Sequence, residues 1–321
     1  MNQMNASPAA IAKSGKPVVL VTAADLASAA IALLESHDIV FAGKTPQPDE
    51  LVALCRQHNP AAIIVRYGNV TAAMMDAAPN LKVISKHGSG IDTIDSAAAK
   101  LRGIDVKAAV GANAAAVAEH AIALLLACAK SIVKMNERMH DGHWDKATHK
   151  SIELNGRTLG LIGLGAIGQR VANTAHALGM RVIGFDPYAT SFPPNVSAVD
   201  LDTIWRESDA ISLHCPLADT NRNLINAVTL TKMKHGVLLV NTARGGLIDE
   251  VALLAAVRSG QVASAGLDSF AVEPVASGHP FFNEANITLS PHIGGVTGDA
   301  YINMGVAAAK NVLAVLANQS H

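Results

Sequence analysis

The stretch Thr158-Leu-Gly-Leu-Ile-Gly163-Leu-Gly165-Ala-Ile-Gly168 contains the pattern that decides the fold. An apolar run typical of a buried strand, residues 158–162, leads directly into three glycines spaced G-x-G-x-x-G, and a helical stretch follows at 169–178. In such a turn the first glycine permits a tight bend, the second lets the backbone approach a diphosphate, and the third lets the helix pack on the strand. The diphosphate then binds to the free N–H groups at the start of the helix. The stretch therefore predicts a dinucleotide-binding unit.

A second feature strengthens this interpretation and indicates which dinucleotide binds. The next predicted strand, 181–185, is followed by Asp186, eighteen residues after Gly168, where an acidic residue binds the ribose hydroxyls. A 2′-phosphate about 4 Å from that carboxylate would be repelled by roughly 4 kcal/mol at an effective dielectric constant near 20. Residues 187–190 contain no Arg or Lys that could accept the phosphate. The sequence predicts NAD as cofactor rather than NADP, and a glycine-rich turn without a ligand is the disfavoured alternative.

The composition is that of a folded protein with little net charge. Half of the 321 residues are apolar, 16% are charged and the net charge is −1. These values disfavour a disordered chain and a basic nucleic-acid surface. Aromatic residues make up only 3% of the chain, which also disfavours a base-stacking platform. We therefore expect a small-molecule ligand and no nucleic-acid partner.

Cysteine usage and the length of the apolar runs bear on where the protein resides. Cys55, Cys128 and Cys215 include no C-x-x-C pair, and an odd set of this kind is typical of a reducing compartment. The strongly apolar run at 121–129 is much shorter than the roughly 20 residues that span a bilayer. The sequence therefore predicts a cytoplasmic protein that is not associated with a membrane.

Short strand-like runs alternate with longer helical stretches through the whole chain, which is the pattern of parallel α/β sheets. A long Ala-rich stretch, 113 to about 139, contains no Gly or Pro and is predicted to form one spanning helix between two such sheets. A last helix is expected at 298–316. The other predicted strands are 17–22, 39–41, 61–65, 82–86 and 105–108 before the long helix, and 210–214, 237–241, 265–267 and 287–289 after it.

Three segments after predicted strands combine a charged side chain with residues that break regular structure, and they contain Arg244, Glu273 and His292. Hydride transfer to a 2-oxo acid needs a fork-shaped cation for the carboxylate. It also needs a proton donor for the carbonyl oxygen, for which His is suited near neutral pH. A carboxylate behind that His would fix its orientation and favour its protonated form. Individually these residues could be a surface cap, a solvated loop residue and a core histidine, but together they favour catalysis.

These motifs resemble the D-isomer-specific 2-hydroxyacid dehydrogenase family, in the branch of 3-phosphoglycerate dehydrogenase and hydroxypyruvate reductase. The resemblance covers nearly the whole chain, and the five motifs stand in the family's order. They are the glycine pattern with Asp186, His214-Cys-Pro-Leu-Ala-Asp-Thr220, the segment around Arg244, Gly266-Leu-Asp followed by Glu273-Pro, and Pro291-His-Ile-Gly-Gly295.

The resemblance implies a doubly wound α/β architecture with two parallel-sheet domains. A Rossmann NAD-binding domain, 113–296, would be inserted into a flavodoxin-like substrate domain formed by 1–112 and a C-terminal helix within 297–321. The resemblance also implies a homodimer and an oxidoreductase in which Arg244 binds the carboxylate of a D-2-hydroxy acid or 2-oxo acid. His292 would be the general acid/base and Glu273 its partner.

The resemblance further implies a set of residues at the cofactor, in addition to those that the glycine pattern itself predicts. The predicted cofactor-binding residues are Val117, Gly163, Gly165, Ala166, Ile167, Gly168, Asp186, His214, Cys215, Pro216, Thr220, Thr242, Ala243, Asp268, Gly294 and Gly295.

A second group of residues is predicted to bind substrate. The run Lys86-His-Gly88-Ser89-Gly90 resembles the family's substrate loop, in which small residues let backbone N–H groups point at an anion. Arg66 and Lys86 correspond to basic positions of the 3-phosphoglycerate dehydrogenase branch. If they face the substrate, it is expected to carry a second anionic group; the alternatives are an ordinary turn at Ser89 and Gly90 and solvated charges at the two basic positions.

Other functions and sites are less well supported by the sequence. An NAD-sensing scaffold, as in corepressors of the same fold, is the alternative to an enzyme, and a formate-type dehydrogenase is disfavoured because that branch has Gln where Glu273 stands. His140, His143 and His149 lie near one another, but no Cys or Glu completes a metal-binding pattern, so no metal is predicted. The sequence leaves open whether the substrate is 3-phosphoglycerate, hydroxypyruvate, glyoxylate, lactate or a sulfonated analogue.

Overall fold

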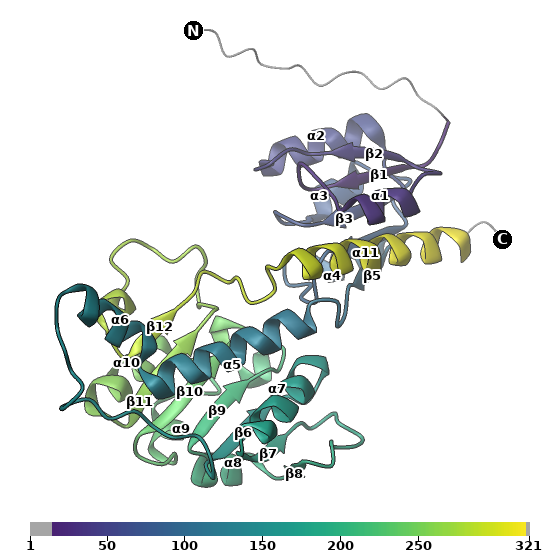
Figure 1. The fold of residues 1–321 in the computed structure, drawn as a ribbon. Helices are drawn as coiled ribbons and strands as arrows, with labels where there is room; N and C mark the ends of the chain where they lie inside the picture. Colours follow the sequence, from purple (N-terminus) through teal and green to yellow (C-terminus); the bar gives the residue numbers. More distant parts are fainter. Residues whose placement is uncertain (1–14, 319–321) are drawn as a thin grey trace, which may run out of the picture. The chain divides into compact units, whose positions relative to one another are not determined.

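The computed structural model describes residues 15–318, and the chain divides into two compact units (Figure 1). Unit 1 comprises residues 1–112 and 301–321, and unit 2 comprises residues 113–300. The first border coincides with the predicted one, whereas the second lies at 300/301 rather than 296/297. The difference arises because the first turn of the last helix, which begins at Gly298, belongs to unit 2.

Unit 1 is built on a five-stranded parallel sheet with the order β2-β1-β3-β4-β5, the flavodoxin-like order. The central strand β3 is buried at all four positions, as expected for a parallel strand covered on both faces. The strands are β1 (Val18–Val21), β2 (Asp38–Phe41), β3 (Ala62–Val65), β4 (Val83–Lys86) and β5 (Asp105–Ala108).

Helices pack on both faces of this sheet because consecutive strand residues point to opposite sides. Leu20 packs with the apolar residues of α2, α3 and α4, whereas Val19 and Val21 pack with α1 and α11. The C-terminal helix therefore completes the core of the N-terminal unit (Figure 1). The helices of unit 1 are α1 (Ser28–Leu33), α2 (Pro48–His58), α3 (Ala72–Asp76), α4 (Ser96–Leu101) and α11 (Gly298–Asn318).

Helix α11 is long and apolar enough to cross a membrane, judged by length and composition alone, and so is the bent pair α5–α6 of unit 2. In the structure, Ala308 and Val312 of α11 are fully buried in the core of unit 1. Asn311 donates a hydrogen bond from Nδ2 to the Ala108 carbonyl at 3.1 Å, and Ser85 donates one from Oγ to the Ala308 carbonyl at 3.1 Å. The apolar residues of α11 thus pack against the sheet of unit 1.

Unit 2 contains a seven-stranded parallel sheet with the order β12-β11-β10-β9-β6-β7-β8. The order reverses between β6 and β9, the switch point where dinucleotides bind in sheets of this type. The short strand β8 was not predicted, since only one of its three residues is buried and no alternation marks it. The strands are β6 (Thr158–Ile162), β7 (Arg181–Phe185), β8 (Val196–Ala198), β9 (Ala210–Leu213), β10 (Val237–Asn241), β11 (Val262–Leu267) and β12 (Ile287–Leu289).

The sheet of unit 2 is also covered on both faces. Leu238 and Val240 of β10 pack with α5 and α7, whereas Val237 and Leu239 pack with α8, α9 and α10. Both units are therefore doubly wound, which confirms the predicted fold class. The helices are α5 (Ala114–Lys130), α6 (Ile132–His140), α7 (Ala166–Ala177), α8 (Leu201–Glu207), α9 (Ala227–Thr231) and α10 (Glu250–Ser259), with short 3₁₀ turns η1 (Asp219–Asn221), η2 (Gly245–Leu247) and η3 (Pro280–Asn283).

The prediction of one continuous helix from 113 to about 139 is wrong. The helix is interrupted at Ser131, whose φ of 52° is left-handed, and the axis of α6 is bent by 60° from that of α5. The Ser131 N–H caps α5 by bonding to the carbonyls of Ala127 and Cys128. Helical periodicity does not reveal this break, because Ser is an uncommon residue in that conformation and neither Gly nor Pro marks the position.

Two buried histidines make the stability of the fold depend on pH. Burial, followed by the nearby charge of Arg66, lowers the pKa of His87 to about 4, and burial lowers that of His214 to about 4. Because an unfolded His titrates near pH 6.5, the unfolded chain binds these protons first as pH falls. The stability from each neutral imidazole is present above about pH 6.5 and is lost progressively toward pH 4.

We predict that His87→Phe reduces this pH dependence. Between about pH 7 and pH 5, the free energy of unfolding should fall by about 2 kcal/mol less in the variant than in the wild type, because one buried titrating group is gone. Urea unfolding at both pH values measures the difference. His176→Gln, which removes an exposed imidazole, controls for the substitution, and an equal pH dependence in His87→Phe and wild type would contradict the prediction.

Candidate active site

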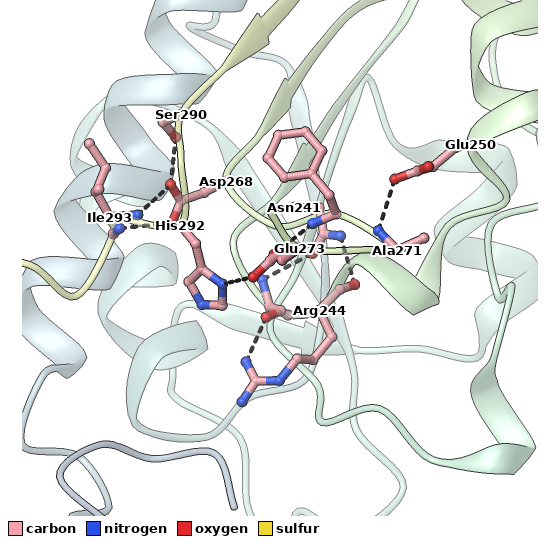
Figure 2. Close-up of polar contacts among 12 residues, drawn as sticks. Asn241, Arg244, Glu250, Asp268, Ala271, Glu273, Ser290, His292 and Ile293 are labelled. Atoms are coloured by element: carbon pink, nitrogen blue, oxygen red, sulfur yellow. Dashed lines mark hydrogen bonds and ion pairs between the residues drawn. The ribbon is translucent and has the colours of Figure 1, made fainter. Parts of the chain in front are cut away.

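The predicted catalytic residues come from loops that follow three neighbouring strands. Arg244 follows β10, Glu273 follows β11 and His292 follows β12, and these strands are adjacent in the sheet. Since all three strands are parallel, their carboxyl ends lie at one edge, so their loops emerge side by side (Figure 2).

Glu273 and His292 are in direct contact. His292 Nδ1 lies 2.7 Å from Glu273 Oε2, and Glu273 Oε1 accepts a hydrogen bond of 2.9 Å from the Phe270 N–H. Because the carboxylate accepts a hydrogen bond, we assign the proton on this side to Nδ1, which leaves Nε2 to exchange a proton with a ligand. The two side chains are 48% and 35% exposed, so a ligand can reach them.

Arg244 stands on a turn that is closed by a buried side chain. Asn241, fully buried, donates from Nδ2 to the Arg244 carbonyl at 2.9 Å, and its Oδ1 accepts from the Ala243 N–H at 3.0 Å. The Arg244 guanidinium donates from Nη1 to the Ala243 carbonyl at 2.7 Å. Figure 2 shows this side chain leaving the same group of loops as the Glu273–His292 pair.

A glycine allows the Arg244 loop to lie against the Glu273 loop. A Cβ atom on Gly245 would lie 1.8 Å from the carbonyl carbon of Phe270 and 2.3 Å from the Ala271 nitrogen. These atoms are backbone, so no side-chain movement could make room for a larger residue at this position. Gly245 is thus required for the close approach of the two loops.

The His292 loop is anchored by Asp268, whose side chain is almost fully buried. Its Oδ1 accepts hydrogen bonds from Ser290 Oγ at 2.6 Å and the Ile293 N–H at 2.9 Å, and its Oδ2 accepts one from the Gly294 N–H at 2.7 Å. His120 Nε2 on α5 lies 3.3 Å from Oδ1. The Asp268 carboxylate thus binds Ser290 before His292 and Ile293 and Gly294 after it (Figure 2). That Asp268 also lies near the nicotinamide stays a prediction.

The anchored loop holds His292 in an uncommon backbone conformation. Its φ is 54°, in the left-handed region that non-glycine residues rarely occupy. Such a conformation persists only where surrounding contacts impose it, and residues of this kind concentrate at functional sites. The contacts of Asp268 with Ser290 and Ile293 are such a constraint.

Sequence reasoning did not identify His120 and Ser290. Besides approaching Asp268, His120 Nε2 lies 2.8 Å from Ser290 Oγ. One signal was available for His120, since Glu119 and His120 interrupt the otherwise apolar stretch 114–129 of α5. No local signal marks Ser290, because its role depends on contact with a residue more than twenty positions away.

The three glycines of the nucleotide motif have distinct environments. Gly163 has a φ of 95°, and a Cβ there would lie 2.6 Å from the His214 carbonyl carbon. A Cβ on Gly168 would lie 2.1 Å from the Gly163 carbonyl oxygen. A Cβ on Gly165, in contrast, would have no protein atom within 4 Å, and the φ of −69° at this position is accessible to any residue. The open space at Gly165 fits the predicted approach of a diphosphate.

Helix α7 begins earlier than predicted, at Ala166 rather than at residue 169. Gly165 is the N-cap, and no side chain caps the helix. Ala166, Ile167 and Gly168 therefore form the first turn, whose N–H groups lack partners within the helix and favour an anion. This correction places the predicted diphosphate-binding residues directly on the helix terminus.

Asp186 joins the end of β7 to the glycine-rich turn. Its Oδ2 accepts a hydrogen bond of 2.8 Å from the Leu164 N–H, and its Oδ1 accepts one of 2.9 Å from the Tyr188 N–H. Each carboxylate oxygen has a second lone pair, so both contacts leave acceptor capacity for ribose hydroxyls. The side chain thus shapes the turn and remains able to bind a ligand.

The remaining predicted cofactor residues differ in exposure. Thr242 Oγ1 is buried and has no hydrogen-bond partner among residues 15–318, so a ligand group could satisfy it. The His214 ring bonds through Nε2 to Ser212 Oγ at 2.9 Å, whereas its buried Nδ1, like Thr242 Oγ1, has no hydrogen-bond partner in the described part of the chain. Burial raises the pKa of the Cys215 thiol to about 11, which argues against a nucleophile. Val117 is buried on α5, and Ala243 is half-buried.

Other cofactor candidates lie on loops. Pro216 and Thr220 are exposed in the segment after β9. Gly295 lies so close to Asn113 that a Cβ on Gly295 would be 2.7 Å from the side-chain Nδ2 of Asn113. Among the described residues, no group of three or more His, Cys, Asp or Glu is arranged to hold a metal ion.

The predicted substrate residues belong to unit 1. Arg66 follows β3, Lys86 ends β4, and Ser89 and Gly90 lie in the next loop. Ser89 is exposed and Gly90 half-buried, whereas Arg66 is only 12% exposed. Lys86 donates from Nζ to Thr93 Oγ1 at 3.3 Å. Neither basic side chain is a simple solvated charge.

A glycine-rich turn at the switch point of a doubly wound sheet suits a dinucleotide, and the nearby His292–Glu273 pair suits proton exchange with a substrate. This combination is typical of an oxidoreductase that uses a nicotinamide dinucleotide. The NAD binding domain of the D-isomer specific 2-hydroxyacid dehydrogenases matches residues 122–294. The chain belongs to this family.

Named relatives agree with this assignment. The chain is 42% identical over 283 residues to a hydroxypyruvate reductase of Thermotoga maritima, covering 87% of this chain and 92% of that protein. It is 41% identical over 256 residues to a D-3-phosphoglycerate dehydrogenase of Archaeoglobus fulgidus, covering 78% of this chain but only 49% of the relative. A solved glyoxylate reductase of Paecilomyes thermophila is 30% identical with a TM-score of 0.84, covering 93% of this chain and 95% of that one.

The comparisons confirm the predicted enzyme class and a nicotinamide cofactor. Members of the family are oxidoreductases that act on the CH–OH group of D-2-hydroxy acids. Nothing in these comparisons supports the corepressor-like alternative.

The glycine environments predict that the same substitution affects cofactor binding at one position and stability at the other. Gly165→Ala should leave the thermal unfolding midpoint near that of wild type but weaken NADH binding about tenfold or more, because the added methyl group occupies the space a diphosphate needs. Gly168→Ala should lower the midpoint, because its Cβ meets backbone. Calorimetry and NADH fluorescence titration measure the two effects. Unchanged NADH affinity in Gly165→Ala would contradict the assignment.

Proposed function

We propose that the chain interconverts a small 2-oxo acid and its D-2-hydroxy acid with NADH and NAD, with His292 as general acid/base. The observation that carries the proposal is the 2.7 Å contact of His292 Nδ1 with Glu273, in a loop group that also bears Arg244. This arrangement supplies a proton donor with a fixed orientation next to a cation that recognises carboxylates.

Each side chain has a separate task in the reduction. The nicotinamide, when bound, supplies a hydride to C2 of the 2-oxo acid. His292 donates the Nε2 proton to the oxygen on C2, and Glu273 accepts a hydrogen bond from Nδ1–H and so fixes the orientation of the ring. Arg244 binds the substrate carboxylate through parallel N–H donors and stabilises the negative charge that develops on the oxygen. In the oxidation, His292 takes the proton back.

We further propose NAD rather than NADP as the cofactor. Support comes from Asp186, which is fixed at the end of β7 by its bonds to Leu164 and Tyr188. A carboxylate held in this position favours two ribose hydroxyls and disfavours a 2′-phosphate. Turnover rates with NADH and NADPH at equal concentration distinguish the two cofactors.

The proposal extends to a cytoplasmic homodimer without nucleic-acid or membrane partners. The free cysteines Cys55 and Cys128, both buried, suit a reducing compartment. Helix α6 has no buried residue and exposes Ile132, Val133 and Met139, and Trp144 beyond it is 76% exposed. Exposed apolar side chains concentrated on one short segment favour contact with a second copy of the chain.

Replacing the proposed acid provides the main test. His292→Ala should lower kcat by about 10²–10⁴-fold, the usual contribution of a general acid/base, whereas NADH affinity should be retained. Absorbance of NADH with hydroxypyruvate and glyoxylate as substrates measures the effect.

His235→Ala is the matched control, because it removes an exposed histidine before β10, at the other end of that strand from Arg244. Wild-type kcat in His292→Ala would refute the role of His292. NADH binding by the wild type without turnover of any 2-oxo acid would instead favour a sensing scaffold.

A further inference from the structure

Glu250 is a carboxylate of unit 2 that the proposed reaction does not use. It is the first residue of α10, and its side chain is 22% exposed. The helix does not need this side chain as a cap, because Asp249 at the N-cap already accepts hydrogen bonds from the Val251 and Ala252 N–H groups. The two oxygens of Glu250 instead contact residues outside the helix.

One oxygen of Glu250 binds the loop that carries Glu273. Oε1 accepts a hydrogen bond of 2.9 Å from the N–H of Ala271, an exposed residue of this loop (Figure 2). Ala271 directly follows Phe270, whose N–H donates to the Glu273 carboxylate at 2.9 Å. The Glu250 contact therefore fixes the loop next to the N–H group that orients Glu273.

The other oxygen connects Glu250 to the apolar core of unit 2. Oε2 lies 3.4 Å from His279 Nε2, and the His279 ring packs edge-on against Phe281 with the ring centres 4.8 Å apart. Phe281 is fully buried in the core. His279 Nδ1 accepts a hydrogen bond of 3.4 Å from the Phe281 N–H, so we assign the proton of the neutral ring to Nε2, which faces Glu250. Glu250 thus joins the packed core to an exposed loop.

The same peptide of the loop also touches backbone. A Cβ on Gly245 would lie 1.8 Å from the Phe270 carbonyl carbon, so Gly245 packs directly on the Phe270–Ala271 peptide. This contact prevents movement toward Gly245 but hardly opposes movement away from it, because individual van der Waals attractions are weak. A hydrogen bond to a carboxylate that is itself held in place restrains both distance and direction. Glu250 supplies that second restraint.

We propose that Glu250 is a positioning residue, which holds the Phe270–Ala271 peptide so that the Phe270 N–H can orient Glu273 toward His292. The inference rests on the proposed function, because the effect on rate is exerted through the Glu273–His292 pair. The role requires an acceptor oxygen at residue 250 rather than a negative charge.

Three substitutions at this residue test the role. Glu250→Ala removes the acceptor and should lower kcat for hydroxypyruvate about tenfold, less than the roughly 10²-fold that a 1 Å misplacement can cost, because the Gly245 contact remains. Glu250→Leu, which keeps most of the side-chain volume, should lower kcat by a similar factor. Glu250→Gln keeps an acceptor oxygen and should retain kcat within about threefold of wild type. NADH affinity should stay within about twofold in all three variants, because the glycine-rich turn is unchanged.

A double-mutant cycle measures whether Glu250 acts through Glu273. Glu273→Ala removes the side chain that the loop positions, so adding Glu250→Ala to this variant should lower kcat by no more than about twofold. A general weakening of the fold would instead lower kcat by the same factor in both backgrounds.

Hydrogen exchange of the Ala271 amide is a readout that does not depend on turnover. The exchange rate should rise by about tenfold in Glu250→Ala, because the amide loses its acceptor, and should stay near the wild-type rate in Glu250→Gln.

Glu284→Ala is the matched control. The Glu284 side chain is 17% exposed and accepts a hydrogen bond of 2.6 Å from Nε of Arg258, which lies on α10 as well. This variant thus also removes a carboxylate that ties α10 to the segment between β11 and β12. It should leave both kcat and the exchange of the Ala271 amide at the wild-type values.

The outcomes separate this inference from the proposed function. Wild-type kcat in both Glu250→Ala and Glu250→Leu, an equal loss in Glu250→Gln and Glu250→Ala, or an unchanged exchange rate of Ala271 overturns the role of Glu250 and leaves the dehydrogenase activity intact. The same holds if Glu250→Ala lowers kcat as much in the Glu273→Ala background as in wild type. A wild type that turns over neither hydroxypyruvate nor glyoxylate contradicts the proposed function, and the inference falls with it.

Discussion

The buried carboxylate of Asp268 is the interaction on which the geometry of the site depends. A buried charge is costly unless hydrogen bonds compensate it, and here Ser290, Ile293, Gly294 and His120 all contact its two oxygens. Three of these four contacts come from the loop that contains His292. The requirement to satisfy one buried charge therefore fixes the course of that loop and the left-handed backbone of His292.

The sheet places the His292 loop, which Asp268 holds, beside the loops that carry the other two catalytic side chains. Because β10, β11 and β12 are parallel neighbours, the loops bearing Arg244, Glu273 and His292 begin at one edge. Gly245 then lets the first two loops touch, and the Phe270 N–H holds the Glu273 carboxylate toward His292. Residues far apart in sequence thus reach one site through backbone contacts that few substitutions could preserve.

The sequence predicts most of the strands and the catalytic pair because local sequence patterns determine them. The predicted strands agree with the observed ones to within about three residues, since apolar runs between turn residues mark buried parallel strands. The pairing of Glu273 with His292 follows from motif order and chemistry. The break at Ser131, the short strand β8 and the early start of α7 at Ala166 escape detection, because each depends on capping or edge pairing rather than on periodicity.

Contacts between residues that are far apart in the sequence are the other feature that sequence patterns do not predict. Asp268 can be recognised as important, but its role as a loop anchor appears only when Ser290 and Gly294 are seen around it. In the same way, the sequence shows Arg66 as a basic residue but does not show that its guanidinium donates to the Asp25 carboxylate. The sign of a local charge depends on tertiary neighbours that a single motif does not contain.

The most direct test of this account is the turnover rate of Asp268→Asn, measured at saturating NADH and 2-oxo acid. The substitution keeps the shape of the side chain but replaces an acceptor oxygen with a donor, so one of the loop's hydrogen bonds must be lost and His292 must shift. A misplacement of about 1 Å can lower a rate about 10²-fold, and we predict a loss of that size in a variant that remains folded. A folded variant with kcat within about twofold of wild type would contradict the claim that this buried charge positions the acid.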